Sequence, residues 1–257
     1  MSVRYGGSTG IIYVSFGELY RDLTILSVLS LRRFGYRGPV RILSDHQNWQ
    51  IDHLDCELLE VPSAGEGFGS RFYKTQVNEY GFDTTLFLDS DTLVIAPIGH
   101  VWHELRFAEM CLSLDFHPDV RDLIARSTKG RDRRQSEYDY MQRLGFLNHP
   151  FYSSGVMLFH RSATTDQLFR NWHEEWEVFG QEDQLALVRA ISRSDCYIHE
   201  LAPRWNTRLN KYGSVEQAQR SGVRILHLRP GNEPLLPTIT AEYAAAGLAA
   251  GGELEKY

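Results

Sequence analysis

One stretch of the sequence, residues 86–94 (Leu-Phe-Leu-Asp-Ser-Asp-Thr-Leu-Val), constrains the fold more than any other. An apolar run reaches an aspartate, a serine separates it from a second aspartate, and apolar residues then resume. A short, continuous apolar run is typical of a buried strand, so we expect a strand that ends at Leu88. Alternation along an extended backbone would then place Asp89 and Asp91 on the same side of the chain, at the edge of a sheet.

This pair of carboxylates predicts a cation site. Two carboxylates that lie side by side repel each other unless a cation lies between them. Hard oxygen ligands of this kind suit Mg²⁺ or Mn²⁺ that holds a substrate phosphate. The alternative is that Asp89 and Asp91 are ordinary turn residues, because aspartate is common in turns. The apolar residues on both sides favour the metal site.

The chain before this stretch alternates between strand and helix patterns. Residues 11–16, 40–43 and 56–61 predict buried strands, and the leucine-rich segment 18–34 predicts an amphipathic helix between the first two. Strand, helix and strand in this order indicate an α/β fold that binds ligands at the carboxyl ends of its strands. The residues expected there, as at a nucleotide-binding crevice, are Ser15, Tyr20, Asp45 and Asp89.

Two basic segments flank the aspartates. Residues 70–77 predict a helix in which Arg71 and Lys74, three residues apart, share a face. The two side chains would contact a ribose or a diphosphate, or they form a solvated basic face. Residues 121–134 carry six basic residues, and we expect a solvated, mobile loop there. The alternative for that loop is a lid over an anionic ligand.

The second half of the chain contributes further candidates. Residues 151–159 predict a strand that arrives at the same site, in which Gly155 would let a ligand or backbone approach closely. Residues 181–184 open a helix, so Asp183 and Gln184 either complement its dipole or point into the pocket. Residues 202–206 predict a loop with an aromatic and an amide, which suits contact with a sugar. His227 ends a last short strand and could complete the metal site.

Composition places the chain among ordinary globular proteins. Its 257 residues allow one large domain or two small ones, with 42% apolar and 23% charged residues. A net charge of −6 gives no argument for binding nucleic acid. The three widely spaced cysteines form no zinc or disulfide pattern, which fits a reducing compartment. We see no signal peptide and no membrane span, and we expect a cytoplasmic location.

With these motifs the chain resembles the retaining glycosyltransferases of GT-A fold, in particular the family of glycogenin and the bacterial lipopolysaccharide galactosyltransferases (glycosyltransferase family 8). Residues 88–91 resemble the family's Leu-Asp-x-Asp motif, and residues 14–20 resemble its first nucleotide-binding loop. The resemblance implies that Asp89, Asp91 and His227 bind Mn²⁺ and that Tyr20 lies against the base. It also implies that Asp183 and Gln184 lie near the reacting sugar.

The sequence departs from the family pattern in two places. Ser153 stands where the family usually has the asparagine of an Asn-x-Gly motif, and Glu233 stands where the family has a lysine that contacts the diphosphate. We expect Arg229 to replace that lysine. The implied nucleotide-sugar site comprises Val14, Ser15, Phe16, Tyr20, Asp45, Arg71, Lys74, Asp89, Ser90, Ser153, Ser154, Gly155 and Arg229.

These observations predict a single GT-A domain over residues 1–257, with a Rossmann-like mixed sheet flanked by helices. Its nucleotide-binding half would span about 10–115 and its acceptor-binding half about 116–240. The expected reaction moves a sugar from a nucleotide-diphosphate sugar, with a UDP-sugar as the expected donor, to an unknown acceptor hydroxyl. Mn²⁺ or Mg²⁺ would assist, and the anomeric configuration would be retained. The alternatives are a sugar-nucleotide pyrophosphorylase and a non-catalytic protein that binds nucleotide sugars or carbohydrates.

Overall fold

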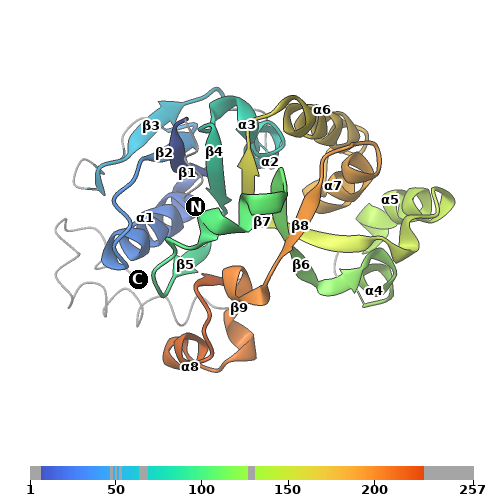
Figure 1. Ribbon diagram of the computed structural model, residues 1–257. Helices are drawn as coiled ribbons and strands as arrows, with labels where there is room; N and C mark the ends of the chain where they lie inside the picture. The colour runs from blue at the N-terminus through green and yellow to red at the C-terminus, as the bar shows by residue number, and fades with distance from the viewer. Residues whose placement is uncertain are drawn as a thin grey trace.

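A seven-stranded sheet, in the order β3-β2-β1-β4-β7-β6-β8, forms the centre of the computed structural model (Figure 1). The structure describes residues 7–46, 49, 51, 54–63, 69–126 and 131–228. Arg229 and the tail from residue 241 lie outside these residues. The strands are β1 (Thr9–Val14), β2 (Val40–Ser44), β3 (Glu57–Glu60), β4 (Thr84–Leu88), β6 (Met110–Asp119), β7 (Pro150–His160) and β8 (Ile198–Leu201).

The sheet is mixed, as predicted. Strands β3, β2, β1 and β4 run parallel, whereas β7 is antiparallel to both of its neighbours, β4 and β6. The register pairs Leu88 at the end of β4 with Val156 in β7. The next amide, that of Asp89, donates to the carbonyl of Gly155 over 2.8 Å. This pairing fixes the predicted aspartate motif beside the predicted glycine.

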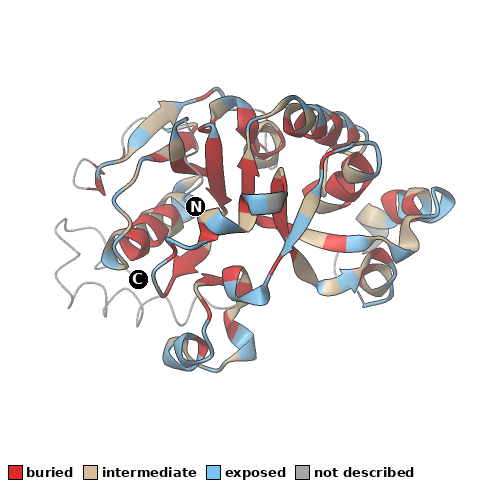
Figure 2. Cartoon of the chain, viewed as in Figure 1, coloured by how far each residue is buried: buried red, intermediate tan, exposed pale blue. Residues whose placement is uncertain are grey.

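Alternating residues of the central strands face two separate cores. One core joins Ile11, Leu86 and Leu88 to α1 (Glu18–Arg33) and to the 3₁₀ segment η2 (Val101–Phe107). The other joins Phe87 and Met157 to α6 (Ala163–Glu177) and α7 (Asp183–Ser192). The central strands are therefore buried on both faces (Figure 2), which explains their continuous apolar sequence. Among the helices that the structure describes, none is long and apolar enough to cross a membrane.

A second, three-stranded sheet has the order β5-β10-β9. It consists of β5 (Thr92–Val94), β10 (Ile225–His227) and β9 (Thr207–Arg208). The register pairs His227 with Thr92 in β5 and with Arg208 in β9. The small sheet therefore carries His227 to the start of β5, directly after the aspartate motif. A small apolar core beneath it includes α8 (Val215–Arg220) and the 3₁₀ segment η5 (Leu209–Lys211).

The segment before the aspartates differs from the prediction of one helix. It forms two short helices, α2 (Gly69–Lys74) and α3 (Val77–Tyr80). Between them the Thr75 hydroxyl donates to the carbonyl of Phe72 and contacts Nδ1 of His173 in α6 over 2.8 Å. These side-chain contacts compete with helical hydrogen bonds and accompany the break, which leaves Lys74 at a helix end.

The basic segment 121–134 is helical where the structure describes it, so the prediction of a loop was wrong there. The segment contributes to two helices, α4 (Val120–Arg126) and α5 (Arg131–Arg143). Residues 127–130 lie outside the described part of the chain. Apolar residues that recur between the charges form a core with α7 and β7, namely Val120, Leu123, Tyr138, Met141, Phe151, Leu185 and Val188. Counting charges alone missed this buried stripe. A further 3₁₀ segment, η3 (Phe146–Asn148), follows α5.

Candidate active site

The two aspartates of the motif project from a tight turn between β4 and β5. The carbonyl of Asp89 accepts the amide of Thr92 over 3.1 Å and the Thr92 hydroxyl over 2.8 Å. The Ser90 hydroxyl donates to the carbonyl of Val14 over 3.2 Å, which ties the turn to the end of β1. The aspartates thus converge through a turn, and the expected extended alternation was wrong at this point. Asp89 and Asp91 are therefore turn residues and also lie close enough together for a metal site, so the two interpretations of this pair do not exclude each other.

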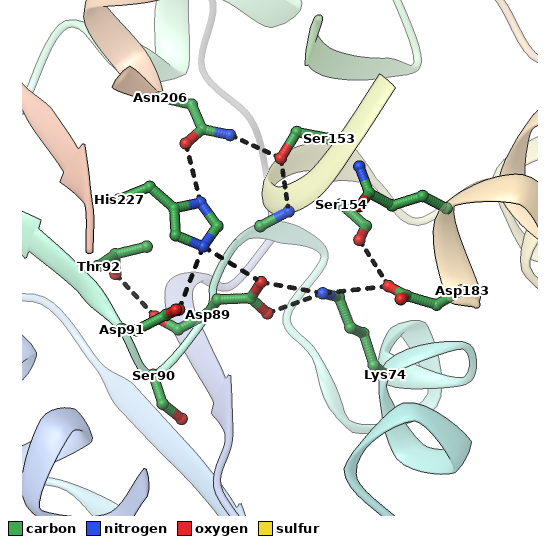
Figure 3. A network of polar contacts seen from close by, with 12 residues as sticks. Lys74, Asp89, Ser90, Asp91, Thr92, Ser153, Ser154, Asp183, Asn206 and His227 are labelled. Carbon is green, nitrogen blue, oxygen red and sulfur yellow. Dashed lines mark hydrogen bonds and ion pairs between the residues drawn. The ribbon is translucent and has the colours of Figure 1, made fainter. Parts of the chain in front are cut away.

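His227 joins the two aspartates at the edge of the sheets (Figure 3). Its Nε2 atom lies 3.2 Å from Oδ1 of Asp91 and 3.9 Å from Oδ2 of Asp89. One ligand atom from each residue lies within 4.8 Å of the other two. Two carboxylate oxygens and an imidazole nitrogen form a donor set that suits Mn²⁺ and accepts Mg²⁺. The residues present therefore fit the predicted divalent metal ion.

Gly155 is the residue that permits this close arrangement. A Cβ atom on Gly155 would lie 2.3 Å from Cε1 and 2.7 Å from Nδ1 of His227, and 3.0 Å from Oδ2 of Asp89. Any larger residue would displace the histidine or the aspartate. Only glycine leaves this space, which agrees with the expectation of close approach on the strand.

A chain of three hydrogen bonds lies on the far side of the imidazole, and one of them is made by the ring itself. Nδ1 of His227 lies 3.2 Å from Oδ1 of Asn206, and Nδ2 of Asn206 donates to Oγ of Ser153 over 3.0 Å. The amide of Gly155 also donates to Oγ of Ser153, over 3.3 Å. The histidine is therefore contacted by carboxylates on one side and by an amide on the other (Figure 3).

Lys74 links the aspartate motif to the start of α7. Its Nζ atom lies 2.8 Å and 3.0 Å from the two oxygens of Asp89, and 3.2 Å from Oδ2 of Asp183. Asp183 also accepts the Ser154 hydroxyl over 2.6 Å and lies 3.4 Å from Nε of Arg71. Lys74 is only 8% exposed, so it is no part of a solvated basic face. It is a buried cation shared by two carboxylates.

Burial and neighbouring charges set the ionisation of this cluster. Burial would raise the pKa of Asp183, but Lys74, Arg71 and the Ser154 hydroxyl lower that pKa to about 2. Burial would lower the pKa of His227, but the adjacent carboxylate of Asp91 raises it. Burial raises the pKa of Asp89, despite the ammonium of Lys74. The site therefore holds a firmly ionised Asp183 beside a histidine that favours positive charge.

These residues line a cavity of about 930 Å³, which is large enough for a nucleotide sugar. Predicted residues from β1, α1, α2 and the aspartate motif that line it are Val14, Phe16, Tyr20, Arg71, Lys74, Asp89, Ser90 and Asp91. Predicted residues from β7, α7 and β10 that line it are Ser153, Ser154, Gly155, Asp183, Gln184 and His227.

Two predicted residues do not line this cavity. Ser15 is fully buried, and its hydroxyl accepts a hydrogen bond from Thr24 in α1 over 3.0 Å. Asp45 lies at the end of β2, 3.7 Å from the imidazole of His46. Position after a strand end predicted both residues, but the site gathers mainly at β1, β4 and β7. Arg229, the proposed substitute for the missing lysine, lies outside the described residues.

The cavity is also lined by residues that the sequence did not single out. Asp115 of β6 binds Nη2 of Arg208 through both oxygens at 3.1 Å, and the guanidinium of Arg208 lies over the ring of Phe116. Gln184 donates to the carbonyl of Tyr152 over 2.9 Å. Arg208 and Asp115 are 93 residues apart in the chain and belong to strands of different sheets, so only their contact in the fold reveals them.

The two residues singled out in the predicted loop 202–206 lie in different places: Trp205 is buried in the core and Asn206 lines the cavity. Trp205, expected to contact a sugar, is 1% exposed, lies within the 3₁₀ segment η4 (Pro203–Trp205), and donates from Nε1 to Glu104. It is a core residue, so that expectation was wrong. Asn206 instead lines the cavity and contacts His227.

Comparisons with known proteins identify relatives of this fold. No family model matches the chain. Glucoside xylosyltransferase 2 of Xenopus laevis is 27% identical over 172 residues, which cover 56% of this chain and 36% of that protein. The chain therefore matches little more than a third of this curated relative's length.

Solved structures show the same architecture at low sequence identity. The galactosyltransferase LgtC, in complex with donor and acceptor sugar analogues, superposes with a TM-score of 0.63 at 14% identity, covering 95% of this chain and 98% of that chain. The apo form of mouse xyloside xylosyltransferase 1 gives a TM-score of 0.55 at 13% identity, covering 86% and 97%. The chain therefore has the fold of the GT-A glycosyltransferases, and it resembles at low sequence identity the family predicted from its aspartate motif.

Proposed function

We propose that this protein is a metal-dependent glycosyltransferase that moves a sugar from a UDP-sugar to an acceptor hydroxyl, with retention of anomeric configuration. The observation that carries the proposal is the convergence of Asp89, Asp91 and His227 within 4.8 Å at the wall of a 930 Å³ cavity. The fold shared with transferases that act on sugars supports the same conclusion. The donor, the metal dependence and retention are parts of the proposal.

Asp89, Asp91 and His227 would hold Mn²⁺ or Mg²⁺. When bound, the ion would neutralise negative charge on the leaving diphosphate. The turn and the β5–β10 register hold these side chains in place before any ligand arrives, since they are tied by backbone hydrogen bonds. Such prior organisation lets charge stabilisation act without reorganisation of the protein.

The start of α7 supplies the second half of the chemistry. Asp183 is held ionised by Lys74 and Arg71, so it would favour positive charge that develops on the sugar ring. Its oxygens are already hydrogen-bonded to Lys74 and Ser154, which suits electrostatic support better than nucleophilic attack. Gln184, next in the helix, would position the sugar hydroxyls.

The two ends of the cavity would bind the two substrates. Phe16 and Tyr20 lie at the end formed by residues 10–115, where Tyr20 would stack on the base. Asp115 and Arg208 lie at the other end with the exposed ring of Phe116, and these groups would contact the acceptor. Tyr20 belongs to the proposed nucleotide-binding half, about 10–115, and Arg208 to the proposed acceptor-binding half, about 116–240, whereas Asp115 lies at their boundary.

A hydrolysis screen tests the proposal. The protein is incubated with UDP-glucose, UDP-galactose, UDP-xylose and UDP-N-acetylglucosamine in Mn²⁺, and released UDP and free sugar are measured. We expect slow release from one donor, loss of release in EDTA, and loss in Asp91→Asn. Release of the sugar with its original anomeric configuration, seen by NMR before mutarotation, would support retention.

The same screen separates the alternatives. A pyrophosphorylase would form UTP and a sugar phosphate when pyrophosphate is added. A binding protein would show a thermal shift with a UDP-sugar and no release of UDP. Neither a thermal shift nor UDP release with any donor in Mn²⁺ would contradict the proposed function.

A further inference from the structure

We propose that Asn206 is a positioning residue that fixes the tautomer of His227 and so presents the lone pair of Nε2 to the metal ion. The inference deepens the proposed function and rests on it, because it assumes that Asp89, Asp91 and His227 bind the ion. Asn206 itself does not contact the metal position; it acts through the histidine.

The hydrogen bonds around the imidazole carry the inference (Figure 3). Nδ1 of His227 faces Oδ1 of Asn206 at 3.2 Å, whereas Nε2 faces Oδ1 of Asp91 at 3.2 Å. The two ring nitrogens therefore point at two different kinds of partner. One is a neutral amide, and the other is the pair of carboxylates that would share a cation.

Only one tautomer of neutral His227 serves as a metal ligand here. A neutral imidazole has one N–H donor and one lone pair. If Nδ1 carries the proton, it donates to the carbonyl oxygen of Asn206 and leaves the lone pair of Nε2 open toward Asp89 and Asp91. If Nε2 carries the proton, that lone pair is absent and the site loses its third ligand. An acceptor at Nδ1 therefore selects the ligating form.

Ser153 contacts the nitrogen end of the Asn206 amide, the end that faces away from the histidine. Its Oγ atom lies 3.0 Å from Nδ2 of Asn206, and its two lone pairs can accept from that nitrogen and from the amide of Gly155. This arrangement turns the Asn206 carbonyl toward His227. Ser153, in the position where an asparagine was expected by family resemblance, thus has a place in a chain that runs from Gly155 through Asn206 to His227.

The backbone on both sides of Asn206 is firmly held. Its own amide donates to the carbonyl of Pro203 over 3.1 Å, and the preceding side chain, Trp205, is buried. The following residue, Thr207, begins β9 and pairs with Leu226, which precedes His227 in β10. Asn206 therefore directly precedes β9, and the pairing of β9 with β10 brings it close to His227.

Metal affinity tests the inference directly. Mn²⁺ is titrated into each variant at saturating UDP, and free Mn²⁺ is counted by electron paramagnetic resonance. Asn206→Leu, which keeps the size and removes the acceptor, should weaken Mn²⁺ binding by roughly 10–100-fold, as outer-shell changes at metal sites do. Asn206→Asp restores an acceptor for Nδ1–H and should recover most of that loss.

A matched control and a spectroscopic measurement complete the test. Asn210→Leu makes the same change at an exposed position four residues along the chain and should leave Mn²⁺ affinity unchanged. In ¹⁵N spectra recorded with Mg²⁺ and UDP, wild type and Asn206→Asp should show a protonated Nδ1 on His227. Asn206→Leu should show a mixture of tautomers, a change that a purely structural role would not produce.

The outcomes separate this inference from the proposed function. If the wild type binds no Mn²⁺ with UDP, the metal site itself is wrong. If the wild type binds Mn²⁺ and Asn206→Leu binds it equally well, the positioning role is overturned. The same conclusion follows if Asn206→Asp is as weak as Asn206→Leu. Should Asn206→Leu fail to fold, Ser153→Ala, which frees the amide to rotate, must still weaken Mn²⁺ binding for the inference to hold.

Discussion

Two acidic regions lie on either side of Lys74, and they differ in how their charge is balanced. At the start of α7, Asp183 is met by the ammonium of Lys74, the guanidinium of Arg71 and the hydroxyl of Ser154. At the turn after β4, Asp89 shares the same ammonium, and Asp91 faces the imidazole of His227. The first region is balanced within the protein, whereas the second gathers two carboxylates around one lysine and a titratable ring.

The difference indicates what each region does. A carboxylate with a complete set of buried partners gains little from a further cation, so Asp183 is suited to keep its charge fixed. Two adjacent carboxylates with an incomplete set are stabilised by a divalent ion. The same residue type is therefore suited to hold a permanent charge in one place and, as proposed, to bind a metal ion in the other.

The largest expected effect comes from removing the shared cation. Lys74→Met should destabilise the protein by about 3–5 kcal/mol, because both buried carboxylates lose a partner. Urea unfolding monitored by circular dichroism measures the change. Lys211→Met, at an exposed position on the same cavity, is the control and should change stability by less than about 0.5 kcal/mol. Equal stabilities for the two variants would mean that Lys74 does not link the regions.

Removing one carboxylate from the turn should affect binding rather than folding. Asp91→Asn should weaken Mn²⁺-dependent UDP binding by about 100-fold or more, because the ion loses a charged ligand. Unfolding should change little, because the lost attraction between Asp91 and His227 opposes the relief of repulsion between Asp91 and Asp89. Isothermal titration calorimetry with and without Mn²⁺ measures the loss. Unchanged affinity for UDP in Mn²⁺ would remove the metal site from the turn.

Asp183→Asn should show the opposite pattern, an effect on stability that depends on pH. The folded pKa of Asp183, about 2, lies below its ordinary value of 3.8, so the ionised form stabilises the fold fully above about pH 4. That stabilisation is lost as pH falls through 2. We expect the variant to be less stable by about 2 kcal/mol at pH 7, and the difference to shrink between pH 4 and pH 2. A difference that stays constant with pH would show that ionisation of Asp183 is not its cause.

The smallest expected effect lies outside both acidic regions. Tyr20 is half exposed at the nucleotide end of the cavity, so Tyr20→Ala should weaken UDP and UDP-sugars alike by about 1 kcal/mol of lost stacking. Fluorescence or calorimetric titration in Mn²⁺ gives both affinities. A loss confined to one sugar donor would place Tyr20 at the sugar instead of the base.

The sequence predicted the strands and the convergence of Asp89, Asp91 and His227 because both have local signals. Continuous apolar runs marked β1, β2 and β4, and the aspartates and His227 each follow or end a short apolar strand. The mixed sheet was predicted from family resemblance, and the order of its strands was not, because antiparallel placement of β7 depends on which edge of the sheet the chain reaches. The turn at Asp89–Thr92 was read as extended, since a two-residue polar interval has no unique backbone conformation.

Contacts between residues far apart in the chain escaped prediction. The sequence left two roles open for Lys74, a solvated one and a functional one. Its burial depends on the contacts of α2 with α6 and α7, which no local pattern shows. Arg208 and Asp115 carry no pattern of their own. The helices at 120–143 were hidden by their charge, although their apolar residues recur at helical spacing. In each case the structure depends on contacts between residues far apart in the chain, which the local sequence pattern does not show.

The register of β5 and β10 places His227 beside the aspartate turn. The aspartates follow β4 of the large sheet, whereas His227 lies in β10 of the small sheet, 136 residues after Asp91 in the chain. If the three residues bind an ion as proposed, metal binding and formation of the small sheet are linked equilibria, and each favours the other. Amide hydrogen exchange in β10 should slow when Mn²⁺ and UDP are added, while exchange in β1 stays unchanged. The proposed ion would then stabilise the pairing of β10 with β5, in addition to its proposed contact with the diphosphate.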